Sequence, residues 1–287
     1  MSDEALTQGR SPWRLIVDRP ADGAWNMAVD EAILEAYDRA APWPAPTLRL
    51  YGWTPPALSI GKSQRSEGSY DERVLAADGI DLVRRPTGGD AVLHEFERTF
   101  AVVGRLGTPP FDGGVLATYR TIAQALACGL AELGVAAEPI EPRRGARPRP
   151  AAACFERTGA WELAVDGRKL VGSAQARRRA AVLQHGSIPI RLEPARLGAA
   201  VGSAVDGARF TDLERACRRA IDADELDRSL VRGFAAAFGV ALLAGRLSET
   251  EALRAAELRC WKYDSMAWTR DGNVGAREAC WGPVVAR

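Results

Sequence analysis

The chain has 287 residues, which is enough for one large domain, or for one domain with a small extension, around a real core. An apolar fraction of 47% with 26% charged residues excludes a disordered or fibrous protein. The formal net charge of +1 gives no electrostatic reason to expect nucleic acid or an anionic membrane as a partner.

The first elements alternate between strand and helix. Residues 13–18 predict a strand, and residues 23–41 predict a helix because their apolar side chains recur near helical spacing. Residues 47–53 alternate as a strand until two prolines interrupt them, and residues 57–64 resume extended structure.

Residues 71–79 predict a short helix closed by Gly79, followed by a strand at residues 80–85. A further run of strand character covers residues 91–104. The clearest helix is expected at residues 115–135, where one stripe carries the apolar side chains of Ile122, Leu126, Leu130 and Leu133. Cys128 lies in this helix and is expected to be buried.

Residues 141–153 form a loop rich in proline and arginine, and a hairpin and a further strand are expected to follow up to Leu192. Beyond Leu192 the pattern is helical, and Ser248 with Glu251 forms a capping box. Strands and helices interleave without a strict strand-helix-strand rhythm. The expected fold class is therefore α+β, with mixed β-sheets and surrounding helices.

The five cysteines are widely spaced, odd in number and contain no CxxC pair. With only two histidines in the chain, this pattern fits neither a disulfide scaffold nor a zinc site, so we expect no metal. Free thiols, together with the lack of a signal pattern or a spanning apolar run, indicate a cytoplasmic protein with no membrane partner.

Lysine is scarce, because Lys62, Lys169 and Lys262 are the only lysines among 38 basic residues. A coding bias toward arginine is one explanation. A retained lysine is nevertheless a candidate for a task that needs an amine, since an amine can lose its proton and a guanidinium cannot.

The stretch RRPTGGDAVLH, residues 84–94, joins paired arginines to a turn that contains Gly88 and Gly89. Adjacent glycines allow positive φ and close approach of a ligand, and the arginines suit an anion. The alternative is an ordinary hairpin turn with surface arginines.

Asp166 and Gly167 predict a type I′ turn that places Ala164 opposite Lys169 and leaves Glu162 diagonal to that lysine. On spacing alone, the favoured interpretation is a surface lysine that forms a weak ion pair with its Glu162 neighbour. Cys154 precedes this hairpin. A nearby ammonium would make its thiol nucleophilic by lowering the thiol pKa from about 8.5, but an isolated cysteine can also be inert.

Three motifs carry a family resemblance. RRPTGGDAVLH, DGRKLVGSAQARR and LQHGSIPI, with the earlier NMAVDEAIL, resemble the biotin/lipoate protein ligase superfamily. The run from CFERTG to HGSIPI is most similar to the Gram-positive type of octanoyltransferase. The resemblance implies the catalytic-domain fold of that superfamily over residues 1–245, with a helical and turn-rich extension at residues 246–287 packed on it.

The same resemblance implies the roles of individual residues. Cys154 would carry an acyl thioester, and Lys169 would lower the pKa of that thiol and hold the acyl carbonyl. The residues expected to bind substrate are Arg85, Gly88, Gly89, His94, Gly172, His185 and Gly186. Asp90 stands where ATP-using ligases typically have a third glycine, which argues against binding of an adenylate.

The activity implied is transfer of octanoate from acyl carrier protein to the lipoyl-domain lysine of an acceptor such as the glycine-cleavage H protein or an E2 subunit, in lipoate biosynthesis. We expect no cofactor and a monomeric enzyme. Two alternatives stay open, namely an ATP-dependent lipoate-protein ligase and a non-catalytic relative that binds lipoyl domains.

Overall fold

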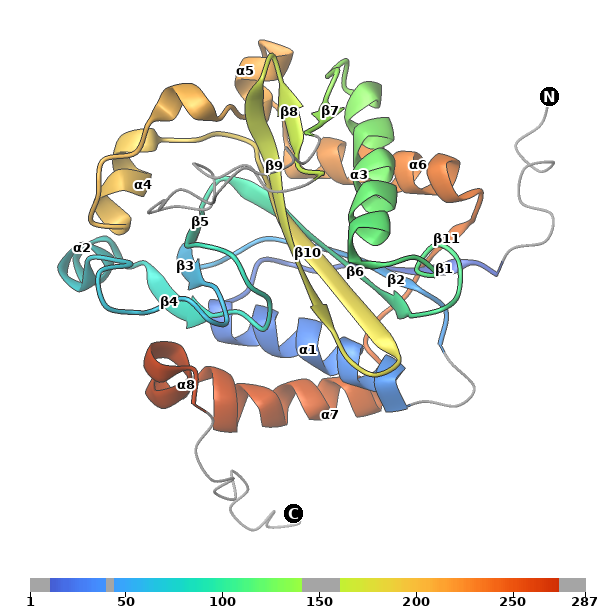
Figure 1. The fold of residues 1–287 in the computed structure, drawn as a ribbon, viewed down its shortest axis with the longest axis horizontal. Coiled ribbons are helices and arrows are strands. Elements are labelled where there is room, and N and C mark those ends of the chain that lie inside the picture. Colours follow the sequence, from blue (N-terminus) through green and yellow to red (C-terminus); the bar gives the residue numbers. More distant parts are fainter. Residues whose placement is uncertain (1–10, 40–43, 141–160, 274–287) are drawn as a thin grey trace.

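The computed structural model describes residues 11–39, 44–140 and 161–273, and its strands and helices form a mixed α+β fold (Figure 1). The main sheet has eight strands in the order β11-β1-β2-β6-β10-β9-β8-β7. The predicted fold class is confirmed. The strands of this sheet are β1 (Trp13–Val17), β2 (Thr47–Tyr51), β6 (Glu97–Arg105), β7 (Glu138–Pro139), β8 (Leu163–Val165), β9 (Arg168–Arg177), β10 (Ala181–Pro189) and β11 (Leu242–Ala244).

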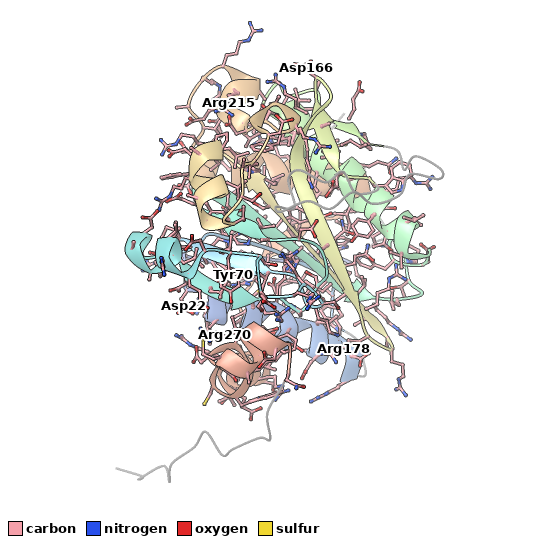
Figure 2. All side chains as sticks on the ribbon, turned by 60° about the vertical axis from the view of Figure 1, so that its left-hand side comes forward. Asp22, Tyr70, Asp166, Arg178, Arg215 and Arg270 are labelled. Atoms are coloured by element: carbon pink, nitrogen blue, oxygen red, sulfur yellow. The ribbon has the colours of Figure 1, made fainter. Side chains whose placement is uncertain are left out.

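Both sheets mix parallel and antiparallel pairs. In the main sheet β1 runs parallel to β2 and β11, and the pairs β2-β6, β6-β10 and β10-β9 are antiparallel. The second sheet has the order β4-β3-β5 and consists of β3 (Ala57–Ile60), β4 (Asp81–Arg84) and β5 (Val92–His94). Figure 2 shows the long β9-β10 hairpin reaching across the molecule, from the turn at Asp166 to the turn at Arg178.

Helices cover both faces of the main sheet because its strands alternate their side chains between two apolar layers. Val102 packs in the layer beneath α3 (Val115–Glu132) and α6 (Ala223–Phe238), and Val103 packs in the layer beneath α1 (Gly23–Arg39) and α7 (Glu249–Leu258). The remaining helices are α2 (Glu72–Asp78), α4 (Pro194–Ala200), α5 (Leu213–Cys217), α8 (Met266–Asp271), and the short turns η3 (Gly207–Arg209) and η4 (Arg259–Tyr263).

The predicted helix boundaries follow from their caps. Gly79 and Gly239 end α2 and α6 in the left-handed conformation, and the capping box of Ser248 with Glu251 begins α7. The strand expected at residues 91–104 is wrong as a single element. Phe96, with φ of 49°, turns the chain between β5 and β6, so this run contributes to both sheets.

Two expectations about the cysteines are also wrong. Cys128 is exposed rather than buried, because it lies on the solvent side of α3 beside Gly129, where that helix meets α6. Cys260 is disulfide-bonded, so not every cysteine is a free thiol. Within the described ranges, no helix is long and apolar enough to cross a bilayer. The division of the chain at residue 245 stays a prediction.

Candidate functional site

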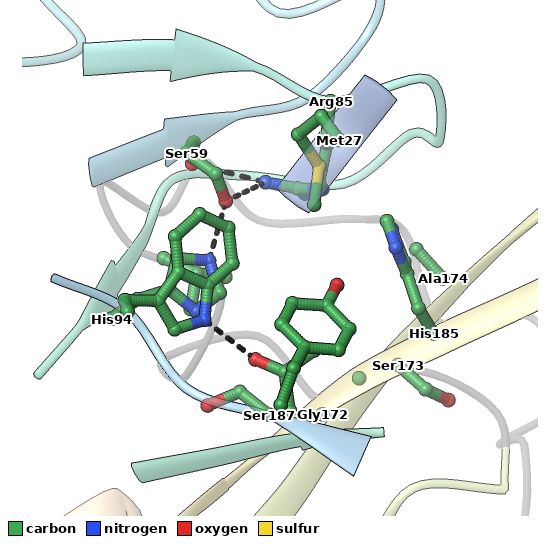
Figure 3. A pocket seen from close by; sticks show the side chains of 14 residues that line it. Met27, Ser59, Arg85, His94, Gly172, Ser173, Ala174, His185 and Ser187 are labelled. Carbon is green, nitrogen blue, oxygen red and sulfur yellow. Dashed lines mark hydrogen bonds between the residues drawn. The ribbon is translucent and has the colours of Figure 1, made fainter. Parts of the chain in front are cut away.

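A pocket lies between α1, the second sheet and the β9-β10 hairpin (Figure 3). The space between its side chains amounts to about 380 Å³, part of it open to solvent. Five of the seven residues predicted to bind substrate line it: Arg85, His94, Gly172, His185 and Gly186. The other lining residues are Met27, Tyr51, Trp53, Ser59, Val92, Thr99, Ser173, Ala174 and Ser187.

His185, on β10, is held from both sides of its ring. Its Nδ1 lies 2.9 Å from the Asp30 carboxylate and its Nε2 lies 2.6 Å from the Thr87 hydroxyl. Burial alone would raise the pKa of Asp30. The Arg49 charge and the hydrogen bonds from His185 and Arg49 outweigh this effect and lower the pKa of Asp30. Because Asp30 is ionised, Nδ1 of His185 donates to it.

Asp30 is therefore the centre of a buried polar network. Besides His185 it accepts hydrogen bonds from Arg49 at 2.7 Å and from the Tyr51 hydroxyl at 2.8 Å. Asp30 and Arg49 are both fully buried. A buried carboxylate with several donors is stable only when all of them are in place, so this network fixes α1 against the pocket.

His94 forms the opposite wall, stacked on Trp53 with ring centroids 3.9 Å apart. Burial lowers the pKa of His94, so the ring is neutral at pH 7. Its Nε2 lies 2.8 Å from the Ser59 hydroxyl, which accepts a hydrogen bond from Arg85. The other ring nitrogen, Nδ1, is buried 3.4 Å from a Glu97 carboxylate oxygen and makes no hydrogen bond with the described residues.

The hydrogen bonds of Arg85 go to the neighbouring chain and not to an open site for an anion. Its guanidinium donates to the carbonyl and hydroxyl of Ser59 and to the carbonyls of Gly88 and Asp90. Gly88 and Gly89 do not line the pocket. Gly89 has the positive φ that the sequence indicates, 95°, and its carbonyl lies where a side chain on Gly61 would stand. The turn is thus shaped by Arg85 and by close backbone packing.

Lys169 is buried, which rules out the surface ion pair considered above. Its Nζ lies 2.7 Å from Glu162 Oε1, with the two side chains 2% and 5% exposed. The turn at Asp166 and Gly167 has positive φ at both residues, and Ala164 stands opposite Lys169 as predicted. A bulge between Leu163 and Ala164 then shifts the register, a feature that turn chemistry alone does not predict.

The Lys169 ammonium lies beside the pocket wall. A methyl group built on Gly172 would stand 3.3 Å from Lys169 Nζ and 3.7 Å from Glu162 Oε1. Gly172 thus gives the ion pair room at the pocket surface. Cys154 lies outside the described residues, so its distance from Lys169 stays a prediction.

Gly186 has a packing role in addition to its place in the pocket wall. A methyl group there would lie 2.3 Å from the Gly172 carbonyl oxygen and 2.7 Å from the Phe100 ring. Only glycine allows β9 and β10 to pair over Phe100 at this point.

The sequence did not single out Asp30, Thr87 or Glu162 as residues of the site. Asp30 had one signal, since NMAVDEAIL places Asn26, Asp30 and Glu31 within an apolar helix, and all three are buried. Buried polar residues require partners, and these partners come from distant segments.

The comparisons with known proteins agree with this fold. The lipoyl protein ligase A/B catalytic domain matches residues 22–235. Octanoyltransferase LipM of Kyrpidia tusciae is 40% identical over 270 residues, which cover 89% of this chain and 97% of the relative. Octanoyltransferase LipM of Moorella thermoacetica is 39% identical over 269 residues, covering 90% and 97%.

Two solved structures have the same fold over most of the chain. A lipoate-protein ligase A bound with ATP has a TM-score of 0.77 at 25% identity, covering 91% of this chain and 99% of that one. The T. acidophilum protein Ta0514 with bound lipoic acid has a TM-score of 0.76 at 25% identity, covering 91% and 100%.

Proposed function

Because the chain belongs to the lipoyl protein ligase A/B catalytic-domain family, we infer that it is an octanoyltransferase, an acyltransferase of lipoate biosynthesis. The observation that carries this inference is the near full-length similarity to octanoyltransferases, which extends over 97% of the length of both relatives named above. The resemblance implied by the sequence motifs is confirmed at the level of the family.

The pocket is suited to an acyl chain. The side chains of Met27, Tyr51, Trp53 and Val92 give it apolar walls, and His94 and His185 are both committed to internal hydrogen bonds. Each methylene removed from water contributes about 0.8 kcal/mol, so a chain of eight carbons binds mainly through such walls. The polar groups then orient the carbonyl end.

We propose two steps for the reaction. In the first, the Cys154 thiolate attacks the carbonyl carbon of the octanoyl thioester on acyl carrier protein, and the carrier thiolate leaves and takes up a proton. One thioester is exchanged for another, so the step is close to isoenergetic and requires no ATP.

In the second step, the neutral amine of an acceptor lysine attacks the acyl-cysteine. The nitrogen of the tetrahedral adduct gives its extra proton to water, the carbon–sulfur bond breaks, and the Cys154 thiolate leaves as the amide forms. Lys169 is proposed to stabilise that thiolate, and the burial of its ammonium beside Gly172 supports this role because charge interactions are strong where water is excluded.

The acceptor is proposed to be a lipoyl-domain protein, either the glycine-cleavage H protein or an E2 subunit. Octanoyl-acyl carrier protein as the donor, a monomeric state and a cytoplasmic location are further proposals from the sequence.

A second candidate function is ATP-dependent lipoate ligation, because a lipoate-protein ligase A bound with ATP has the same fold. The commitment of Arg85 to Ser59 and to two carbonyls of the turn favours the transferase, since a phosphate would have to displace these partners. Asp90 follows the turn glycines and adds a negative charge.

The test is a transfer assay with an isolated lipoyl domain as acceptor, read by the mass of that domain. We expect an octanoyl group to appear when octanoyl-acyl carrier protein is supplied without ATP. Modification that requires both free lipoate and ATP would select the ligase. Binding of the lipoyl domain without modification from either donor would select the non-catalytic relative.

A further inference from the structure

The part of the chain that contains η4 and α8, residues 259–271, has no role in the account above, and we call it the C-terminal clasp. Figures 1 and 2 show α8 lying against the end of the molecule that carries β4 and α2. The clasp makes buried polar contacts with α1, which lines the pocket through Met27, and with β4, which ends directly before Arg85. One of its turns, η4, is π-helical, a rare conformation that is frequent at functional sites.

The first contact joins the clasp to α1. Lys262 Nζ lies 2.5 Å from Glu31 Oε2, with both side chains less than a tenth exposed, and the Tyr263 hydroxyl donates to the same oxygen. Lys262 also lies over the Trp268 ring at 4.1 Å. Burial lowers the pKa of Lys262 and the Glu31 carboxylate opposes this, so the ammonium depends on its partner.

The second contact joins the clasp to β4. The buried Arg84 guanidinium donates to the carbonyls of Trp268 and Arg270 in α8, and to the carbonyl of Gly61 on the other side. In return, Trp268 Nε1 donates to the Arg84 carbonyl at 2.9 Å. Arg84 was expected to flank an anion site, and the structure instead directs it to the clasp.

Glu31 and Arg84, the two residues that the clasp contacts, are each adjacent in the chain to a residue that supports the pocket. Glu31 follows Asp30, which holds His185, and Arg84 precedes Arg85, which holds Ser59 and the glycine turn. Successive side chains point in different directions on a helix and to opposite faces on a strand. The clasp therefore contacts α1 and the end of β4 at residues adjacent in the chain to Asp30 and Arg85, which support the pocket.

We propose that the clasp is part of the acyl-transfer site, with Lys262 and Trp268 as positioning residues. Lys262 acts through Glu31 on the Asp30-His185 pair. Trp268 acts through Arg84 on Arg85 and so on the Ser59-His94 pair. Small displacements of such groups reduce rates roughly tenfold to a hundredfold. Since no residue of the clasp lines the pocket, its effect is exerted through Glu31 and Arg84.

The chain offers a direct readout, because its only two histidines are His94 and His185. In protein labelled with ¹⁵N-histidine, the imidazole spectrum reports on the two walls of the pocket separately. Lys262→Met is expected to shift the His185 signals more than the His94 signals. Trp268→Phe is expected to shift the His94 signals more than the His185 signals. Trp268→Phe keeps the aromatic packing and removes only the hydrogen bond from Nε1 to the Arg84 carbonyl. It therefore still tests the proposal if Lys262→Met does not fold.

The control is Arg14→Met. Arg14 forms a part-buried ion pair with Glu251 at 2.7 Å, which joins α7 to β1 and involves no residue of the pocket. It is expected to lower the melting temperature while leaving both histidine signals in place. Lys262→Arg, which keeps the charge, is expected to restore part of the wild-type spectrum.

The kinetic measurement rests on the proposed octanoyl transfer. The histidine spectrum can be measured and interpreted without it. The two clasp variants are expected to lower kcat for acyl transfer at least roughly tenfold, with KM for the donor changing less, and Arg14→Met to stay within about twofold. The inference would be overturned if the histidine signals and kcat were unchanged in both clasp variants. It would also be overturned if Arg14→Met changed them as much as the clasp variants do. An inactive wild type with moving histidine signals would instead refute only the proposed function.

Discussion

Substitution of Asp30 by asparagine tests the buried network behind the pocket. The wild-type carboxylate accepts hydrogen bonds from Arg49, Tyr51 and His185, at 2.7, 2.8 and 2.9 Å. Breaking a buried ion pair by removing one partner costs about 3–5 kcal/mol. The asparagine amide in Asp30→Asn keeps one acceptor oxygen, and Asp18 still lies 2.7 Å from Arg49, so we expect the lower end, about 3 kcal/mol.

The loss should depend on pH in one direction. The pKa of Asp30 is lower in the folded protein than in the unfolded chain, so its contribution is complete above the unfolded value of about 3.9 and is lost as the pH falls toward the folded value. Urea denaturation at a series of pH values should show a gap between wild type and Asp30→Asn that is full at neutral pH and narrows in acid.

A surface carboxylate provides the comparison. Asp78 pairs with Arg196 at 2.8 Å where both side chains are partly exposed, and Asp78→Asn should cost less than about 1 kcal/mol. An Asp30→Asn protein that loses no more free energy of unfolding at pH 7 than Asp78→Asn would refute the view that Asp30 organises this network.

Three further predictions concern the pocket. Gly186→Ala should lower the free energy of unfolding by about 1–3 kcal/mol in urea denaturation, because the added methyl group meets the Gly172 carbonyl at 2.3 Å; full stability would contradict this. Because the pKa of His94 is lowered in the folded protein, only the unfolded chain binds a proton at this residue just below about pH 6.5. The free energy of unfolding should therefore decrease as the pH is lowered through this range. His94→Gln should reduce that decrease by up to about 1.4 kcal/mol per pH unit. Glu162→Leu alone should lower the free energy of unfolding by about 3 kcal/mol, because it leaves the buried Lys169 ammonium without this partner. Adding Lys169→Met should recover part of that loss. If the two single effects were strictly additive in this double-mutant cycle, the two charges would not interact.

Local rules predicted the elements whose determinants lie within a few residues. The type I′ turn at Asp166 and Gly167, the cap at Gly79 and the capping box at Ser248 all follow from neighbouring residues, and all are present. The break at Phe96 carries no such signal, because phenylalanine rarely adopts positive φ.

Burial of charged groups was the main feature that the sequence could not predict. Lys169 and Arg84 look like surface residues by type, and each is 2% exposed. Arg84 donates to the Trp268 carbonyl in α8, 184 residues further along the chain. Lys169 pairs with Glu162 across a bulged hairpin. The contact of Arg84 with α8 depends on the whole topology, and no local pattern encodes it. The hairpin pattern placed Glu162 near Lys169 but did not show that both are buried.

The family motifs located most of the pocket without giving its internal contacts. His94, His185 and Gly172 line it as the resemblance implied. Gly88 and Gly89 act instead by shaping the turn through their backbone, and Asp30 contributes although no role was assigned to it. Motifs identify a site, and the hydrogen-bond partners that keep it in place become visible only in three dimensions.

The mass of the intact protein after incubation with octanoyl-acyl carrier protein, in the absence of ATP and of any acceptor, tests the proposed mechanism most directly. We predict the gain of one octanoyl group, which is absent in Cys154→Ala and is retained in Cys128→Ala and Cys217→Ala, the two free cysteines of the described residues. No gain in the wild type, or a gain that persists in Cys154→Ala, would contradict the acyl-enzyme mechanism.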